Sequence, residues 1–285
     1  MKGIILAAGK GTRLYPMTKP VCKPLLPVYD KPLIYYPLAV LMQAGIRDVL
    51  TIVPPRETGT FQALLGHGES FGMRISYAEQ MVQRGIADAL RIGKDFAGKD
   101  RVCLILGDNI FHAPGLKNVL RQAAARREGA VVFGCWVEDP RPFGVVEFDA
   151  KGQAVSIEEK PARPKSHYIV PGLYFYDSQV MEIAEHLQPS ARGELEITDV
   201  NLRYLRQGQL WVEPLDRDLI WLDAGTADSL LHAAQVIKEL QTESGRYVGC
   251  LEELALENGW LTPEQVHAAG EALGMTLYGQ YLQCL

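Results

Sequence analysis

Short apolar runs alternate with helical patterns through the first half of the chain, and this alternation strongly constrains the fold. Apolar residues recur at helical spacing at Tyr36, Val40 and Ala44, and Gly45 follows as a helix stop. The pattern predicts an α/β fold: a Rossmann-like, mostly parallel central sheet with helices on both faces. Strands are expected at residues 2–6, 48–53, 74–77, 102–106 and 130–136, with helices at 34–44, 58–65, 86–96 and 116–127.

The pattern changes after Asp139-Pro140-Arg141-Pro142, where strands become frequent and helices few. Strands are expected at residues 144–148, 154–158, 169–176, 211–214 and 220–222, and the sequence Asp-Ala-Lys-Gly at 149–152 predicts a hairpin turn. We expect an inserted antiparallel portion that lines the ligand cleft. Helices at 228–240 and 262–272 follow. We therefore expect one main domain at residues 1–225, made of a first part at 1–137 and a second part at 138–225. A helical segment at 226–285 follows, for packing and oligomerisation.

Length and composition narrow the class of protein. The 285 residues suffice for one large or two small domains. The net charge is −5 without a dense run of Lys and Arg, so no nucleic-acid partner is expected. The five cysteines are odd in number and lack a Cys-x-x-Cys pair, which favours reduced thiols in a cytoplasmic protein. No apolar run reaches the length of a membrane span, so no membrane partner is expected.

A glycine-containing loop follows the first predicted strand. The apolar run at 3–7 ends in Ala8-Gly9-Lys10-Gly11-Thr12-Arg13. Glycines let backbone N–H groups approach an anion, and a guanidinium matches phosphate oxygens. The loop fits neither the dinucleotide fingerprint, because residue 14 is Leu, nor the P-loop, because Lys-Ser/Thr is missing after Gly11. The segment therefore predicts a phosphate cradle of another type, with an ordinary strand-to-helix turn as the alternative.

Two aspartates stand where predicted strands end. Asp108 follows the run at 102–106, and Asp223 follows the run at 220–222. Mg²⁺ typically takes one or two protein carboxylates and completes its shell with phosphate and water oxygens. The alternative for each is local: a turn at Asp108 and a helix N-cap at Asp223. The sequence alone leaves both possibilities open.

Three cations are candidates for phosphate binding. Lys23 lies in a loop stiffened by prolines, Lys160 follows Glu158-Glu159, and Arg192 precedes a predicted helix. Solvated surface charges, an offset charge pair and a charged helix start are the respective alternatives. The chain has no Gly-x-Ser-x-Gly elbow, no zinc pattern and no kinase signature, so the chemistry should need neither an activated hydroxyl nor an imidazole base.

Read together, these motifs resemble the sugar-1-phosphate nucleotidyltransferases, and among them the glucose-1-phosphate thymidylyltransferases. The resemblance spans nearly the whole chain. It is carried by the glycine loop and by PVYDKPLIYY (27–36), LGDNIF (106–111), GVVEFD (144–149), EEKP (158–161), GLYFYD (172–177), RGELEITDVN (192–201) and WLDAGT (221–226).

The resemblance implies Mg²⁺-dependent nucleotidyl transfer from dTTP to glucose 1-phosphate, giving dTDP-glucose and pyrophosphate, the first step towards dTDP-deoxysugars such as rhamnose. It implies that the catalytic residues are Arg13, Lys23, Asp108 and Lys160, and that Asp108 and Asp223 hold the metal. The nucleotide would contact Ala8, Gly9, Gly11, Thr12, Arg13, Gln80 and Gly85. The sugar phosphate would contact Asn109, Gly144, Glu159, Lys160, Val170 and Arg192. The helical tail resembles that of homotetrameric members.

Some positions depart from the family pattern. Ala8 replaces a glycine, Pro24 a glutamine and Phe143 a tyrosine, and residues 80–86 read QMVQRGI instead of a proline-containing stretch. Glu257 also stands where an arginine would meet a diphosphate in the family's feedback site, which predicts weak inhibition by dTDP-rhamnose. Two alternatives stay open: the same chemistry with UTP or another sugar 1-phosphate, and a non-catalytic sugar-nucleotide-binding regulator.

Overall fold

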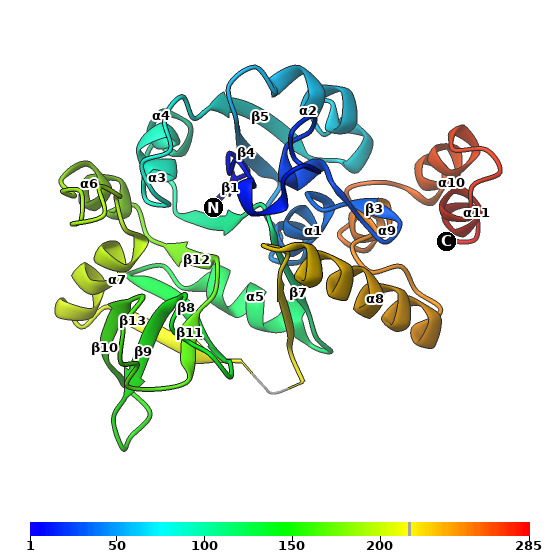
Figure 1. Cartoon of the computed structure of the whole chain (residues 1–285). Coiled ribbons are helices and arrows are strands. Elements are labelled where there is room, and N and C mark those ends of the chain that lie inside the picture. Colours follow the sequence, from blue (N-terminus) through cyan, green and yellow to red (C-terminus); the bar gives the residue numbers. More distant parts are fainter. Residues whose placement is uncertain (216–217) are drawn as a thin grey trace.

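The computed structural model describes residues 1–215 and 218–285, and its centre is a large twisted sheet (Figure 1). The strands follow the order β10-β9-β11-β8-β12-β6-β1-β4-β5, with β13 paired to β8. Their bounds are β1 Lys2–Leu6, β4 Asp48–Val53, β5 Arg74–Glu79, β6 Val102–Leu106, β8 Ala130–Trp136, β9 Gly144–Phe148, β10 Ala154–Glu159, β11 Tyr168–Val170, β12 Leu173–Tyr176 and β13 Leu210–Pro214.

Four of the five strands predicted in the first half form the parallel part of this sheet, whereas the fifth, β8, pairs antiparallel with β11 and β12. Strands β5, β4, β1 and β6 are parallel neighbours, with Ile4 opposite both Leu50 and Leu104. Strands β9, β10, β11 and β12 pair antiparallel with their neighbours, and the turn at 149–152 joins β9 to β10. Strand β13 pairs parallel with β8, so the expected antiparallel pairing is wrong for residues 211–214. They do not form a separate sheet, because β12 inserts antiparallel between β6 and β8 and makes the sheet continuous. The fold is therefore an α/β fold with a mixed sheet.

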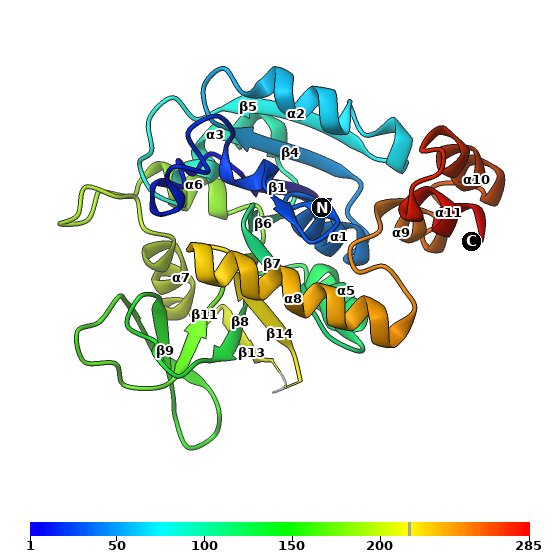
Figure 2. The ribbon, with the colours of Figure 1, turned by 45° about the vertical axis from the view of Figure 1, so that its right-hand side comes forward.

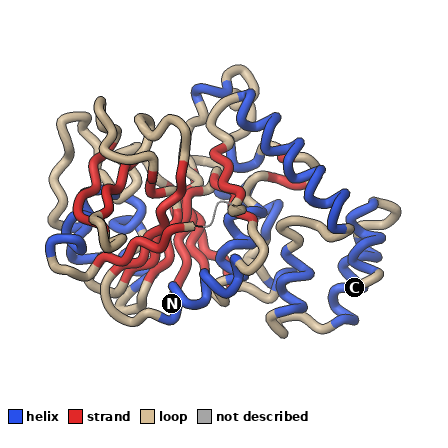
Figure 3. The backbone as a smooth tube through the Cα atoms, turned by 90° about the horizontal axis from the view of Figure 1, so that it is seen from below, coloured by secondary structure: helices blue, strands red, loops and turns tan. Residues whose placement is uncertain are grey.

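Helices cover both faces, as the alternation predicted (Figure 3). They are α1 Tyr35–Gln43, α2 Thr58–Leu65, α3 Asp88–Ile92, α4 Lys94–Ala97, α5 Leu116–Ala125, α6 Val180–Glu185, α7 Ile197–Arg206, α8 Ala227–Ser244, α9 Leu251–Glu257, α10 Pro263–Ala272 and α11 Leu277–Gln283. Because successive strand side chains point to opposite faces, Ile5 packs with α1, α2 and α5 while Ile4 packs with α3, α6 and α7.

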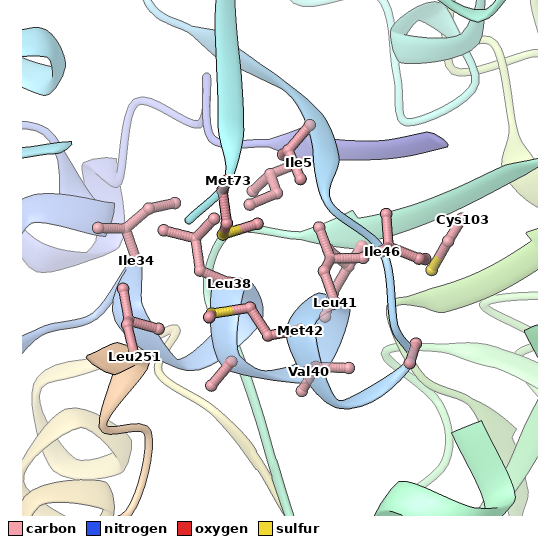
Figure 4. Close-up of a cluster of buried hydrophobic side chains, with 14 of the residues drawn as sticks. Ile5, Ile34, Leu38, Val40, Leu41, Met42, Ile46, Met73, Cys103 and Leu251 are labelled. Atoms are coloured by element: carbon pink, nitrogen blue, oxygen red, sulfur yellow. The ribbon is translucent and has the colours of Figure 1, made fainter. Parts of the chain in front are cut away.

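The core on the α1 face joins the helical tail to the sheet. Figure 4 shows Leu38, Leu41 and Met42 of α1 beside Ile5 of β1, with Leu251 of α9 near the start of α1. These side chains are fully buried, and each contributes roughly 1.5–3 kcal/mol to folding. Helices α10 and α11 pack on one another at the end of the molecule farthest from β9 and β10 (Figures 1 and 2).

Several elements differ from the sequence-based prediction. The expected helix at 86–96 is broken at Gly93, and the expected strand at 169–176 is interrupted at Pro171-Gly172. Helix α7 is the one expected after Arg192, whereas α6, α9 and α11 were not predicted. These three span six or seven residues, which is too short for a strong periodic signal, and their stability comes from tertiary burial.

Two short ribbons complete the fold. Strand β7 (Asn109–His112) pairs antiparallel with β14 (Ile220–Asp223), and β2 (Pro27–Val28) pairs with β3 (Lys31–Pro32). Gly107 and Asp108 form the turn that the local alternative expected, but the chain continues as a strand and not as a helix, so Asp108 caps no helix. Within the described residues, no helix is both long and apolar enough to cross a bilayer.

Candidate active site

The candidate site lies where the strand order reverses at the carboxyl edge of the parallel strands. The chain proceeds from β1 to β4 and β5 on one side and then crosses to β6 on the other, which makes β1/β6 a topological switch point. The glycine loop follows β1 and Asp108 follows β6. The two strand ends approach so closely that a Cβ at Gly107 would lie 3.0 Å from the Ala7 Cα. A ligand at this point meets both loops.

Lys23 and two aspartates converge at the switch point. The Lys23 Nζ lies 2.5 Å from Asp108 Oδ2 and 3.8 Å from Asp223 Oδ1. The β7–β14 ribbon brings the distant aspartates together, because its register places Asn109 opposite Asp223. Lys23 is 5% exposed, so the solvated-lysine alternative is wrong for this residue.

The electrostatics of this cluster favour a cation. Burial and, secondly, the negative charge of Asp108 raise the pKa of Asp223, although Lys23 and Arg13 act in the opposite direction. Two hard carboxylate oxygens next to the glycine loop form a donor set that suits Mg²⁺. No third His, Cys, Asp or Glu joins them among the described residues, so phosphate and water oxygens would have to complete the shell.

Arg13 reaches this cluster from the glycine loop. Its Nη2 would lie 3.0 Å from a Cβ at Gly225, and the Asp223 carboxylate would lie 3.1 Å from the same position. Any side chain at 225 would therefore collide with both groups. Thr12 and Arg13 belong to a short 3₁₀ turn, Thr12–Leu14, which starts after Gly11.

The backbone of the glycine loop is held open for a ligand. Gly11 has a φ of 60°, and its carbonyl accepts a hydrogen bond from Thr18 Oγ1 at 2.6 Å. A Cβ at Gly9 would meet nothing within 4 Å, which leaves the backbone accessible. Ala8 lies outside the left-handed region, so the replacement of the usual glycine is tolerated.

A cavity of about 190 Å³ extends from the switch point towards the antiparallel strands. Its wall contains eight of the expected site residues: Arg13, Asp108, Asn109, Gly144, Glu159, Lys160, Val170 and Asp223. Thr198, Asn201 and the aromatic pair Phe143–Trp221 also line it. A neighbouring cavity of about 130 Å³ is lined by Gly9, Lys23 and Asp108.

Lys160 adopts an uncommon backbone conformation at the cavity wall. Its φ is 45°, a value that is rare for a residue with a side chain, and its backbone N–H donates to the Phe143 carbonyl. The adjacent Glu159 accepts a 2.5 Å hydrogen bond from Thr198 Oγ1. Lys160 Nζ and Glu159 are 3.9 Å apart, so the carboxylate and the ammonium face one cavity.

Two expected sugar-phosphate residues are already engaged. The Arg192 Nη2 lies 2.8 Å from Glu196 Oε1, and 3.4 Å from both Glu159 and Glu194. Arg192 is not among the residues that line the described cavity. It is connected to the cavity through its contact with Glu159, which does line it. Asn109 is 3% exposed and donates to Asp108 Oδ1 while accepting from Trp221 Nε1 and the Gly172 N–H. It thereby orients Asp108.

The loop after β5 approaches the glycine loop from the other side. Gln83 Nε2 donates to the Ala8 carbonyl at 2.7 Å, and Gln80 Nε2 donates to Asp88 Oδ2 at 3.0 Å. Gly85 has a φ of 105° and lies against Leu195, because an added Cβ would be 2.5 Å from that residue's carbonyl oxygen. Gln83, which lies between the expected base-reading residues Gln80 and Gly85, therefore connects this loop to the glycine loop.

The sequence interpretation missed Thr198, Gln83 and Asp88. Thr198 lay inside the quoted RGELEITDVN motif, so its position in a family motif was an available signal. Gln83 bonds to Ala8, 75 positions away, and Asp88 bonds to Gln80 across the loop between β5 and α3; a sequence carries no periodic signal for either hydrogen bond.

A larger cavity of about 480 Å³ lies away from this site, between α1, α5 and the start of the helical tail. Its wall includes Lys117, Arg246, Glu253 and Glu257. Both cations are paired: Lys117 with Glu257 at 2.8 Å, and Arg246 with Glu257 at 2.9 Å and also with Glu253. The carboxylates therefore offset the cations that a diphosphate would need, and weak feedback inhibition stays a prediction.

Comparisons with known proteins agree with the sequence resemblance. The family model described as "Nucleotidyl transferase" matches residues 2–239. Glucose-1-phosphate thymidylyltransferase from Neisseria gonorrhoeae is 55% identical over 99% of this chain and 98% of its own length. The enzyme of that name from Mycobacterium tuberculosis is 53% identical over 99% of this chain and 98% of its own length.

Solved structures support the same assignment. A Bacillus anthracis protein assigned as a glucose-1-phosphate thymidylyltransferase, in complex with sucrose, superposes with a TM-score of 0.77 at 44% identity, covering 83% of this chain and 94% of that chain. A UDP-glucose pyrophosphorylase has a TM-score of 0.73 over 84% of this chain and 98% of its own, but its 22% identity shows the fold alone. The chain belongs to the nucleotidyl transferase family and, within it, to the glucose-1-phosphate thymidylyltransferases.

Proposed function

We propose that this protein transfers a thymidylyl group from dTTP to glucose 1-phosphate, giving dTDP-glucose and pyrophosphate. The observation that carries the proposal is the convergence of Lys23, Asp108, Asp223 and Arg13 at the β1/β6 switch point. The proposal also agrees with the enzyme activity for which relatives are named that are more than 50% identical over nearly their whole length.

The site has room for two phosphorylated substrates on opposite sides of this cluster. The glycine loop follows β1 and Gln80 follows β5, and two strand spacings, about 10 Å, separate these strands, so a nucleotide would lie across the strand ends with its phosphates at the glycine loop and its base near Gln80. The 190 Å³ cavity lies on the other side and carries Glu159 and Lys160. A carboxylate suits sugar hydroxyls, and an ammonium suits a phosphate.

The chemistry follows from these positions. A phosphate oxygen of glucose 1-phosphate attacks the α-phosphorus of dTTP, the bond to the β-phosphate bridging oxygen breaks, and pyrophosphate leaves. The attacking phosphate is ionised near neutral pH, since the second phosphate pKa is about 6, so no general base is required. Arg13 and Lys23 would offset charge on the triphosphate, and Lys160 would hold the attacking phosphate. Catalysis then consists of positioning and charge stabilisation.

A divalent metal fits the carboxylate pair. Asp108 and Asp223 would hold Mg²⁺, whose charge would stabilise the phosphate oxygens of the reacting nucleotide. Asn109 would keep Asp108 oriented through the 2.9 Å hydrogen bond to its Oδ1. Support for the assignment comes from the raised pKa of Asp223, because a cation relieves the repulsion between two partly buried carboxylates.

A pyrophosphate-release screen tests the proposal. The protein is assayed with dTTP, UTP, dCTP and ATP against glucose 1-phosphate and other sugar 1-phosphates, with Mg²⁺ and with EDTA. We expect the highest kcat/KM for dTTP with glucose 1-phosphate, and no turnover in EDTA. A preference for UTP or another sugar would favour the first alternative. Binding without turnover for every pair would favour a regulator and contradict the proposal.

The remaining assignments belong to the same proposal. Residues 1–137 would bind the nucleotide, residues 138–225 the sugar phosphate, and residues 226–285 would support packing and a homotetramer. Exposed apolar side chains at Leu273, Met275 and Leu277 in the tail support an interface there. Sedimentation at several concentrations tests the tetramer. A cytoplasmic location is supported by the five free cysteines.

A further inference from the structure

Two buried polar side chains form a pair in the loop after β5. Gln80 is 5% exposed and Asp88 is 6% exposed, and the amide Nε2 of Gln80 donates to Asp88 Oδ2 at 3.0 Å. Gln80 directly follows β5 and Asp88 begins α3, so the pair closes the base of the intervening loop. The pair lies outside the described cavity walls, and the expected role of Gln80 in base recognition does not account for Asp88.

The chemistry of the partner decides which way the amide points. A glutamine amide has a donor end and an acceptor end, and rotation by half a turn exchanges them. A carboxylate only accepts, so Asp88 holds the NH₂ group and turns Oε1 away from itself. The reversed amide would set two acceptors against each other in a buried place and lose this hydrogen bond.

We propose that Asp88 is a positioning residue that makes Gln80 present a hydrogen-bond acceptor to the nucleobase. An acceptor there selects bases whose N3 carries a hydrogen, namely thymine and uracil. It rejects cytosine, because N3 of cytosine is itself an acceptor and would be left facing Oε1. This inference rests on the proposed function, and it deepens it by assigning the basis of pyrimidine selection.

The loop itself does not depend on Asp88. The backbone N–H of Gln80 donates to the Val53 carbonyl, Ala87 N–H donates to the Leu195 carbonyl, and Leu195 N–H donates to the Arg84 carbonyl. Gln83 adds the hydrogen bond to Ala8. A substitution at Asp88 therefore changes the polarity of its partner while these bonds continue to hold the loop.

The test is the ratio of kcat/KM for dTTP to kcat/KM for dCTP, both with glucose 1-phosphate. In the unmodified enzyme we expect a ratio of at least about 100, since buried polar groups left unpaired discriminate strongly. In D88N the new side chain can either accept or donate, so both amide orientations are populated. We expect the ratio to fall at least about tenfold, mostly through gained dCTP turnover. A smaller ratio in the unmodified enzyme, or a smaller fall, overturns the inference.

D88E is the matched control, because it keeps an acceptor-only side chain. It should keep the ratio; a fall equal to that of D88N would show that the carboxylate is not the determinant. Thermal unfolding verifies that each variant folds. Should D88N not fold, D88S replaces it, because a hydroxyl also donates or accepts. An unmodified enzyme that makes no nucleotide sugar from dTTP refutes the proposed function, whereas dTTP turnover with an unchanged D88N ratio refutes this inference alone.

Discussion

Replacing Asp223 by Asn should raise the thermal stability of the metal-free protein while it lowers activity. Asp223 is a partly buried carboxylate, with 27% of its side chain exposed, and it faces the like charge of Asp108. Its raised pKa means that the folded protein favours the neutral form, despite attraction from Lys23 and Arg13. Asn has nearly the same shape and is always neutral, so the substitution relieves this penalty.

The magnitude follows from the linkage between pKa and stability. Each unit by which folding raises the pKa corresponds to about 1.4 kcal/mol at a pH above both values. Burial and the charge of Asp108 raise the pKa of Asp223, and Lys23, whose Nζ lies 3.8 Å from Asp223 Oδ1, partly offsets them. We therefore expect D223N to gain free energy of unfolding on the order of 1 kcal/mol. For a protein of this size the gain corresponds to a Tm increase of about 2 °C.

The pH dependence shows the direction in which the substitution changes the free energy of unfolding. The usual pKa of Asp is 3.8, and the folded value of Asp223 lies above it. The penalty of the wild-type protein is therefore absent below 3.8, appears as the pH rises through the folded pKa, and is complete at neutral pH. The advantage of D223N should accordingly be present at pH 7 and vanish as the pH falls below about 4.

Differential scanning calorimetry in EDTA, from pH 4 to 8, measures the effect. Asp228→Asn is the matched control: Asp228 is an exposed residue in the first turn of α8, where a negative charge favours the helix dipole, so its loss should lower stability by about 0.3–1 kcal/mol. Added Mg²⁺ should stabilise the wild type more than D223N. A lower Tm for D223N at pH 7, or a gain independent of pH, would refute the reasoning.

Three other substitutions test separate parts of the structure. Gly85→Ala places a Cβ 2.5 Å from the Leu195 carbonyl at a φ of 105°, so it should cost about 1–3 kcal/mol and raise the KM for dTTP more than that for glucose 1-phosphate, as measured by calorimetry and steady-state kinetics. Lys160→Gln should lower kcat/KM by roughly 10²–10³ with unchanged Tm, and an unaffected rate would exclude its assigned role. Tyr278→Phe removes the 2.6 Å hydrogen bond to the buried Glu252 and should cost about 1.5–3 kcal/mol in urea unfolding while activity stays near wild type.

Local patterns were sufficient to predict most of the sheet. Strands β1, β4, β6, β8 and β9 begin and end at the predicted residues, because each is a short apolar run bounded by polar or turn residues. The glycine loop, Lys23 and the two aspartates could also be identified as candidates, since glycines and charged groups after strands are visible in one dimension. Their family order made the nucleotidyltransferase assignment specific.

Pairings between distant residues could not be predicted in the same way. Arg192 illustrates this: the sequence suggested a phosphate ligand, whereas the structure brings its guanidinium within 3.4 Å of Glu159, 33 positions away, and leaves it outside the described cavity wall. Lys23 illustrates the reverse, because a residue that resembles a surface lysine is buried against Asp108. In both cases the outcome depends on which charges the fold brings within a few ångström.

The sequence by itself determined the alternation of strands and helices, the glycine loop after β1 and the charged residues that follow the strands. These depend on contacts between near neighbours in the chain, which leave periodic patterns. Only the tertiary structure decided that Asp108 and Asp223 share one site and that Asp88 orients Gln80. The first pair is joined across 115 positions by the β7–β14 register, and the second by one hydrogen bond. Interactions of this kind arise from chain topology and burial, and neither leaves a period in the sequence.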